Sequence, residues 1–213
     1  MYKVTIKIKF LIKLIYRKTI FYADHLYQKL FDIILQKDFS EEVTSCNYKQ
    51  SKLYEVKTIF KTLNTNHKVF LDVGSGKGAV LFLAKKFDFI KIYGVEIDDC
   101  LHSISVSNFK DKKDNRIKLI NSDIFKINKK TLDSVNIFYL FNPFPYNETA
   151  RFVSLVTKSY QRNKREIQII YTCSKYNFLF TQENIFKEMK EIHFFVSNSP
   201  TIIFTNQSGQ SYD

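Results

Sequence analysis

Residues 69–78 read VFLDVGSGKG, an apolar segment that runs directly into three closely spaced glycines. The first five residues have the length and apolar character of a buried strand, and residues 79–87 place apolar side chains on one face of a helix. Glycines adopt positive φ at little steric cost and admit a ligand close to the backbone, while N–H groups at the helix start face it. This order of strand, glycine-rich loop and helix predicts a ligand site at residues 74–78.

Strands and helices continue to alternate along the rest of the chain. Further strands are predicted at 91–97, 117–124, 136–144 and 166–173, and helices at 98–109, 147–162 and 178–190. Two closing strands, 193–196 and 201–205, flank a turn-like cluster without a helix between them, so we expect them to pair antiparallel. Because crossovers through helices make parallel strands, the sequence predicts an α/β fold. It is a doubly wound, Rossmann-like, mostly parallel seven-stranded sheet with an antiparallel strand near its end.

The N-terminal part of the chain has a different, basic character. We predict helices near 21–36 and 50–63, and divide the chain into a basic helical extension, 1–44, and an α/β domain, 45–213. The net charge of the 213 residues is +12, and residues 1–37 carry eight Lys and Arg against two Asp. These basic residues interrupt the apolar ones too often for a membrane-spanning helix or a secretory signal. We expect an amphipathic helix that packs on the domain or lies on an anionic membrane surface.

The cysteines and histidines do not support a metal site. Cys46, Cys100 and Cys173 lie far apart and form no CxxC pair, and the four histidines form no HxxxH or HExxH pair. We therefore predict no metal. Unpaired cysteines suit a reducing compartment, so the expected location is cytoplasmic, with residues 1–37 as a candidate contact to the membrane.

Two classes of cofactor fit the glycine loop. Read as G-x-G-x-x-A, Gly74, Gly76 and Ala79 satisfy the dinucleotide-binding fingerprint, and Glu96 stands about 20 residues on, where an acid binds a ribose diol. Read as G-x-G-x-G, Gly74, Gly76 and Gly78 match the loop of class I S-adenosylmethionine methyltransferases. The loop alone does not separate a nicotinamide-dependent oxidoreductase from a methyltransferase.

Two further strand ends favour the second class. Residues 121–125, NSDIF, end the third strand, and residues 142–145, NPFP, end the fourth. With the loop and Glu96 in order, residues 45–206 resemble class I S-adenosylmethionine-dependent methyltransferases, most of all bacterial members of unassigned substrate with a GxGKG loop and an NPF motif. The resemblance implies an enzyme that uses S-adenosyl-L-methionine. A nicotinamide-dependent oxidoreductase is less favoured, because the NPF motif has no role in one.

The resemblance also implies roles for individual residues. Glu96 would bind both ribose hydroxyls, Asp123 would accept from the adenine amino group, and Asn142 would lie below the methionine ammonium and the sulfonium. A segment holding Tyr48 and Ser51 would close over the cofactor carboxylate. The implied cofactor-binding residues are Tyr48, Ser51, Asp72, Gly74, Ser75, Gly76, Gly78, Glu96, Ile97, Asp123, Ile124 and Asn142. Asn142 and Phe144 are the candidate catalytic residues, although Phe144 reads equally as a core aromatic.

The methyl acceptor stays open. Residues 142–145 match only in part the [N/D]-P-P-[Y/F/W] motif of enzymes that methylate planar amino groups, since the aromatic returns only at Tyr146. That departure puts adenine and glutamine amides in doubt. The compact chain favours a small molecule, glycan or lipid intermediate as acceptor. The positive net charge favours the alternative, a nucleic acid or protein.

Overall fold

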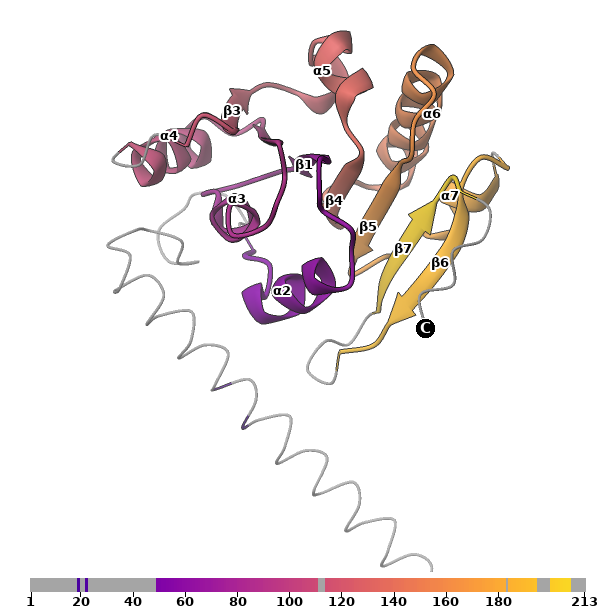
Figure 1. The fold of residues 1–213 in the computed structure, drawn as a ribbon, viewed down its shortest axis with the longest axis horizontal. Helices are drawn as coiled ribbons and strands as arrows, with labels where there is room; N and C mark the ends of the chain where they lie inside the picture. The colour runs from indigo at the N-terminus through magenta and orange to yellow at the C-terminus, as the bar shows by residue number, and fades with distance from the viewer. Residues whose placement is uncertain are drawn as a thin grey trace, which may run out of the picture.

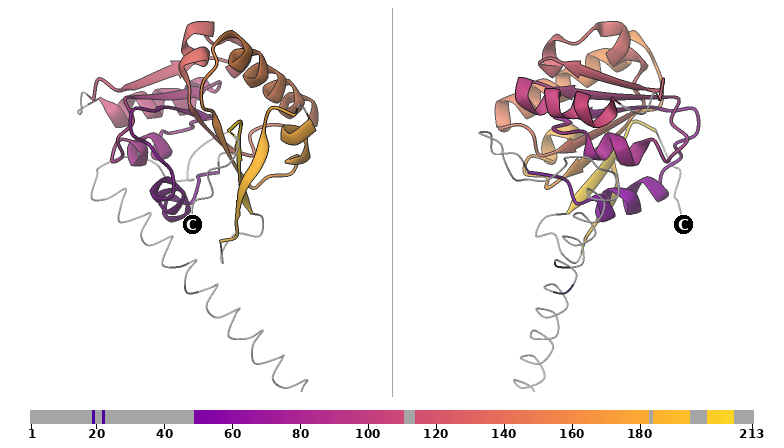
Figure 2. Two further views of the ribbon diagram at one scale, coloured as in Figure 1. Left: turned by 45° about the vertical axis from the view of Figure 1, so that its right-hand side comes forward. Right: turned by 90° about the vertical axis from the view of Figure 1, so that its left-hand side faces the viewer.

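The computed structural model describes Thr19, Tyr22 and residues 49–110, 114–182, 184–194 and 200–207. Tyr48 lies outside these residues, as does the predicted extension 1–44 apart from Thr19 and Tyr22. The membrane contact expected for residues 1–37 therefore stays a prediction. The described chain folds around one twisted sheet with helices on both of its faces (Figure 1, Figure 2).

Seven strands form this sheet in the order β3-β2-β1-β4-β5-β7-β6. They are β1 Val69–Val73, β2 Lys91–Glu96, β3 Ile117–Asn121, β4 Ile137–Phe141, β5 Gln168–Thr172, β6 Lys187–Ile192 and β7 Thr201–Thr205. The pairs from β3 through β5 are parallel, whereas β7 is antiparallel to both β5 and β6. The predicted fold class is confirmed. The position of β7 also distinguishes this sheet from the dinucleotide-binding order 3-2-1-4-5-6, in which no antiparallel strand separates the fifth strand from the sixth.

Helices cover the two faces of the sheet in two groups. They are α2 Leu53–Lys61, α3 Ala79–Ala84, α4 Asp99–Phe109, α5 Lys129–Ser134, α6 Tyr146–Arg162 and α7 Phe178–Gln182, with a 3-10 turn, η1, at Ile124–Lys126. Helices α2 and α3 pack on one face, and α5, α6 and α7 pack on the other, where α6 is seen in Figure 2. No helix in the described part of the chain has the length and apolar content needed to cross a membrane.

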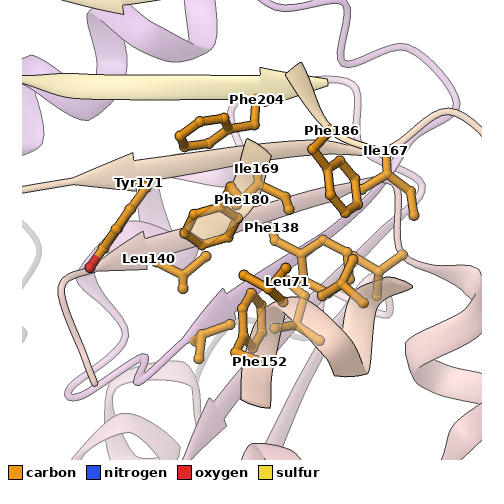
Figure 3. Packing of buried hydrophobic residues seen from close by; sticks show 14 of the residues in the cluster. Leu71, Phe138, Leu140, Phe152, Ile167, Ile169, Tyr171, Phe180, Phe186 and Phe204 are labelled. Atoms are coloured by element: carbon orange, nitrogen blue, oxygen red, sulfur yellow. The ribbon is translucent and has the colours of Figure 1, made fainter. Parts of the chain in front are cut away.

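Each face of the sheet has its own apolar core. On the face of α6 and α7, the rings of Phe138 and Phe152 meet edge to face at 5.8 Å, and those of Phe180 and Phe204 stack at 4.8 Å (Figure 3). On the face of α2, the ring of Phe60 packs edge to face against the rings of its aromatic neighbours. Fully burying a phenylalanine contributes about 1.5–3 kcal/mol. Burial on both faces explains why the central strands, β1, β4, β5 and β7, read as mostly apolar runs.

The structure corrects two predicted elements and adds one that was not predicted. The helix predicted at 178–190 is wrong beyond Gln182, because Lys187–Ile192 forms the edge strand β6. Glu, Met and Lys are good helix formers in this segment, but pairing with β7 overrides propensity, and charged side chains are common on edge strands. The strand predicted at 193–196 is wrong for His193 and Phe194, which follow β6 and are not part of a strand. The other two residues of that predicted strand lie outside the residues that the structure describes. Helix α5 was not predicted, although Asn128 caps it by accepting from Lys130 N.

Candidate functional site

A cavity of about 620 Å³ opens at the carboxyl edge of the sheet. After β1 the chain builds β2 and β3 on one side and then crosses to β4 on the other, and open α/β sheets bind ligands at such a switch point. The volume falls within the roughly 300–1,000 Å³ of small-molecule sites. The lining residues are Lys49, Gln50, Ser51, Asp72, Val73, Gly74, Ser75, Gly76, Ala79, Val80, Glu96, Asp98, Leu101, Phe141, Asn142, Pro143, Cys173 and Lys175.

The glycine loop has the backbone conformation that its sequence predicts. Gly74, Gly76 and Gly78 have φ of 75°, 52° and 86°, a region that side chains with a Cβ avoid. The N–H groups of Gly74 and Ser75 both donate to Val95 O, at 2.9 and 3.0 Å. The loop is therefore tied to β2, and its first N–H groups are used inside the protein rather than presented to a ligand.

Gly94 in β2 makes this close approach of loop and strand possible. A Cβ at that position would lie 2.4 Å from Leu81 Cδ1 and 2.9 Å from Ser75 Oγ. Sequence reasoning did not single out this glycine. Its signal was present, since a glycine inside a strand often marks a site where another backbone comes close.

Glu96 is buried at the end of β2 and lines the cavity. Its Oε2 accepts a hydrogen bond from Gly76 N at 2.7 Å, and its Oε1 accepts from Asp98 N at 2.9 Å. A carboxylate offers about four lone-pair directions, so each oxygen keeps about one acceptor direction for a ligand. A rigid carboxylate of this kind suits two adjacent hydroxyl groups.

Asp72 adds a second buried carboxyl group to the cavity lining. Burial, and next the neighbouring charge of Glu96, raise the pKa of Asp72 well above its usual range. A cation in the cavity would oppose both effects and favour the charged carboxylate. Lys49 and Lys175 are exposed elsewhere on the lining. The cavity therefore offers groups for a ligand that carries both positive and negative charge.

Asn142 occupies the turn after β4 with a left-handed φ of 41° and lines the cavity. Its Oδ1 accepts a hydrogen bond from the Tyr171 hydroxyl at 3.1 Å, which fixes the carboxamide against β5. Asparagine tolerates this backbone region better than most residues do. Phe144 is placed differently, because its ring packs 5.7 Å from both Phe125 and Phe152. Its side chain therefore belongs to a row of packed aromatics and does not line the cavity.

The structure brings together seven of the predicted site residues in the cavity lining: Ser51, Asp72, Gly74, Ser75, Gly76, Glu96 and Asn142. The others among the described residues, Gly78, Ile97, Asp123, Ile124 and Phe144, do not line it. Asp123 instead accepts from Phe125 N at 3.0 Å, and Ile97 is 68% exposed. Asp98, Cys173 and Lys175 were missed. Cys173 and Lys175 follow β5 at the same edge of the sheet, and this position after a predicted strand was the signal that could have identified them.

Within the described ranges, no group of three His, Cys, Asp or Glu residues lies close enough to hold a metal ion. No protein-family model matches the chain. A curated relative, the ribosomal RNA small subunit methyltransferase A of Pelagibacter ubique (strain HTCC1062), is 31% identical over 96 residues. This match covers 45% of the chain and 35% of the relative, so the chain spans about a third of the length of that protein.

Solved structures match over a larger part of the chain. A methyltransferase from Pyrococcus furiosus has a TM-score of 0.61 and 17% identity, over 86% of this chain and 96% of its own. An RNA methyltransferase from Salinibacter ruber in complex with S-adenosyl-L-homocysteine has a TM-score of 0.55 and 12% identity, covering 78% and 98%. Magnesium protoporphyrin IX methyltransferase from Synechocystis PCC 6803 with bound S-adenosylmethionine has a TM-score of 0.56 and 13% identity, over 72% of this chain and 78% of its own. The chain has the fold of S-adenosylmethionine-dependent methyltransferases.

Proposed function

We propose that the chain binds S-adenosyl-L-methionine in the cavity and transfers its methyl group to RNA. The observation that carries the proposal is the pair of buried carboxyls, Asp72 and Glu96, at the switch point of this fold. The cofactor supplies an electrophilic methyl group on a positively charged sulfonium. Its ribose diol and its cationic centres are the groups that the two carboxyls suit.

Glu96 would hold the ribose, because each of its oxygens keeps an acceptor direction at a fixed position. Asp72 would face the cationic end of the cofactor, and Ser51 with Lys49 would face its carboxylate. Ser122 N donates to the backbone oxygen of Glu96 at 2.9 Å, and Asp123 and Ile124 directly follow Ser122 in the chain. That contact supports our assignment of these two residues, with Ile97, to the adenine end.

Asn142 would orient the acceptor for the transfer. Methyl transfer is an in-line displacement, in which alignment of the reacting atoms is the main contribution of the protein. The hydrogen bond from Tyr171 limits rotation of the Asn142 carboxamide, and the left-handed backbone turn holds it at the cavity. Phe144 remains a candidate for shaping the acceptor side only through its packing against Phe125.

RNA is favoured as the acceptor by the comparisons and by charge. The curated relative and the Salinibacter ruber protein are RNA methyltransferases by name. The protoporphyrin enzyme acts on a small molecule by name, but the comparisons as a whole do not support the small molecule, glycan or lipid expected from the sequence. A net charge of +12 favours a polyanionic partner. A nicotinamide cofactor is disfavoured, because β7 separates β5 from β6.

The cofactor half of the proposal is tested by isothermal titration with S-adenosylmethionine, S-adenosylhomocysteine and NAD. Glu96→Ala should weaken binding of the first two, at about 1.5–3 kcal/mol per charge-assisted hydrogen bond lost. Glu188→Ala, at an exposed acid on the edge strand, is the matched control and should leave affinity unchanged. Binding of NAD alone would refute the proposal.

The acceptor half is tested by transfer of a labelled methyl group to RNA. Total RNA, total protein and a lipid extract are offered in parallel with labelled S-adenosylmethionine. Label in RNA that is lost with Glu96→Ala and kept with Glu188→Ala is the expected result. Label confined to the protein or the lipid extract would refute RNA as the acceptor and leave the cofactor half standing.

A further inference from the structure

Three aromatic side chains gather where the chain leaves β4 and β5. The ring of Tyr146 lies 5.6 Å from that of Tyr176, at an interplanar angle of 84°, and 6.3 Å from that of Phe178. Tyr146 and Phe178 are each 47% exposed, and Tyr176 is half-buried. Rings of this size are usually buried, so two large exposed rings in mutual contact call for an explanation.

This aromatic cluster, Tyr146, Tyr176 and Phe178, lies beside the part of the cavity that Pro143 and Lys175 line. Tyr146 begins α6 three residues after Pro143, which lines the cavity, and Tyr176 directly follows the lining residue Lys175. Three residues of extended chain span at most about 11 Å. The cluster therefore joins the loops after β4 and β5, both of which contribute residues to the cavity lining, and it lies within reach of a substrate that extends out of the cavity.

We propose that the aromatic cluster is a stacking platform for an unpaired base of the RNA acceptor. The inference rests on the proposed function and specifies its substrate as single-stranded at the point of contact. Sequence-tolerant binding of single strands combines stacking on aromatic rings with positive charge along the backbone. Lys175 supplies an exposed positive charge one residue from Tyr176.

The size of the cluster favours a base over a protein partner. An aromatic side chain buries about 150–250 Å² at most, and two of these three are already partly covered by each other. A stable protein interface needs about 800 Å² on each partner. Three rings fall short of that area, but the face of one or two of them is enough for a nucleobase.

The test uses the full chain with saturating S-adenosylhomocysteine and a single-stranded oligoribonucleotide that carries 2-aminopurine, whose fluorescence falls when it stacks. Tyr146→Ala and Phe178→Ala should each weaken binding by about 5- to 150-fold, the range for loss of one stacked base. Tyr146→Phe keeps the ring and should bind as the wild type does. Tyr54→Ala is the matched control, because Tyr54 is 61% exposed on α2, which packs on the opposite face of the sheet.

Titration of S-adenosylhomocysteine into each variant keeps this inference separate from the proposed function. Unchanged cofactor affinity with weaker RNA binding supports the platform. Wild-type RNA binding by both alanine variants, or an equal loss of binding to the same strand annealed to its complement, overturns it. A wild-type chain that binds the cofactor but not the oligoribonucleotide also overturns the platform, whereas failure to bind the cofactor overturns the proposed function itself.

Discussion

Substituting Gly94 by alanine tests the packing of the glycine loop on β2. Gly94 lacks the positive φ that would strain an alanine, so in open space the substitution should stabilise the protein by about 0.4–1 kcal/mol. The structure predicts the opposite sign. The new Cβ would lie 2.4 Å from Leu81 Cδ1, which must move at least about 0.6 Å to reach the 3.0 Å limit of real Cβ contacts.

Neither neighbour of this Cβ can yield easily. Leu81 is fully buried, and Ser75, whose Oγ would lie at 2.9 Å, is held through its N–H to Val95 O. Overpacking of a filled core costs about 1–3 kcal/mol. We therefore expect Gly94→Ala to unfold at lower denaturant concentration, and to bind S-adenosylmethionine more weakly because Ser75 and Gly76 are displaced in the cavity wall.

Urea unfolding followed by circular dichroism measures the first effect, and isothermal titration measures the second. Leu81→Ala provides the double-mutant cycle, since it removes the atom that would clash. Gly94→Ala should then be less harmful in the Leu81→Ala background than in the wild type. A Gly94→Ala protein as stable as the wild type, or more stable, would refute the reasoning.

Two further predictions concern the polar groups of the cavity. Burial and the charge of Glu96 raise the pKa of Asp72 in the folded, cofactor-free protein. Asp72 therefore contributes its full stabilisation below its pKa in the unfolded chain, about 3.9, and this stabilisation is lost as the pH rises through the raised pKa of the folded state. Urea unfolding across this range should show the decline in the wild type, and Asp72→Asn should lack it; parallel curves would contradict the assignment. Tyr171→Phe removes the hydrogen bond to Asn142, so it should cost about 0.5–1.5 kcal/mol in unfolding experiments. It should also lower kcat for methyl transfer without raising KM for the cofactor, and a change in KM alone would refute a positioning role.

The sheet and the cofactor loop were predictable because their signals are local. An apolar strand, a glycine-rich loop and an acid at the next strand end lie within 28 residues, 69–96, and each follows from backbone conformation or strand burial. β6 was not predictable in this way. Its residues favour a helix by propensity, and only pairing with β7, which comes later in the chain, makes Lys187–Ile192 a strand.

The candidate site was predictable in part for the same reason. Asp72, Glu96 and Asn142 stand at strand ends, where the fold itself brings them to one edge. The side chain of Phe144 turned instead into the packing around Phe152, a direction that a short motif does not determine. Cys173 reaches the cavity through the pairing of β5 with β4, which relates residues about 30 positions apart.

The place of β7 in the sheet has a consequence for folding during translation. β7 is translated after β6, yet it lies between β5 and β6 and pairs with both. While the chain emerges from the ribosome, the facing edges of β5 and β6 have no partner until residues 201–205 arrive. Unpaired strand edges recruit other chains, so this interval is the time at which the nascent protein most needs a chaperone. A stop codon between positions 193 and 200 would leave that edge open permanently, and such a product should aggregate even though every residue lining the cavity has been made.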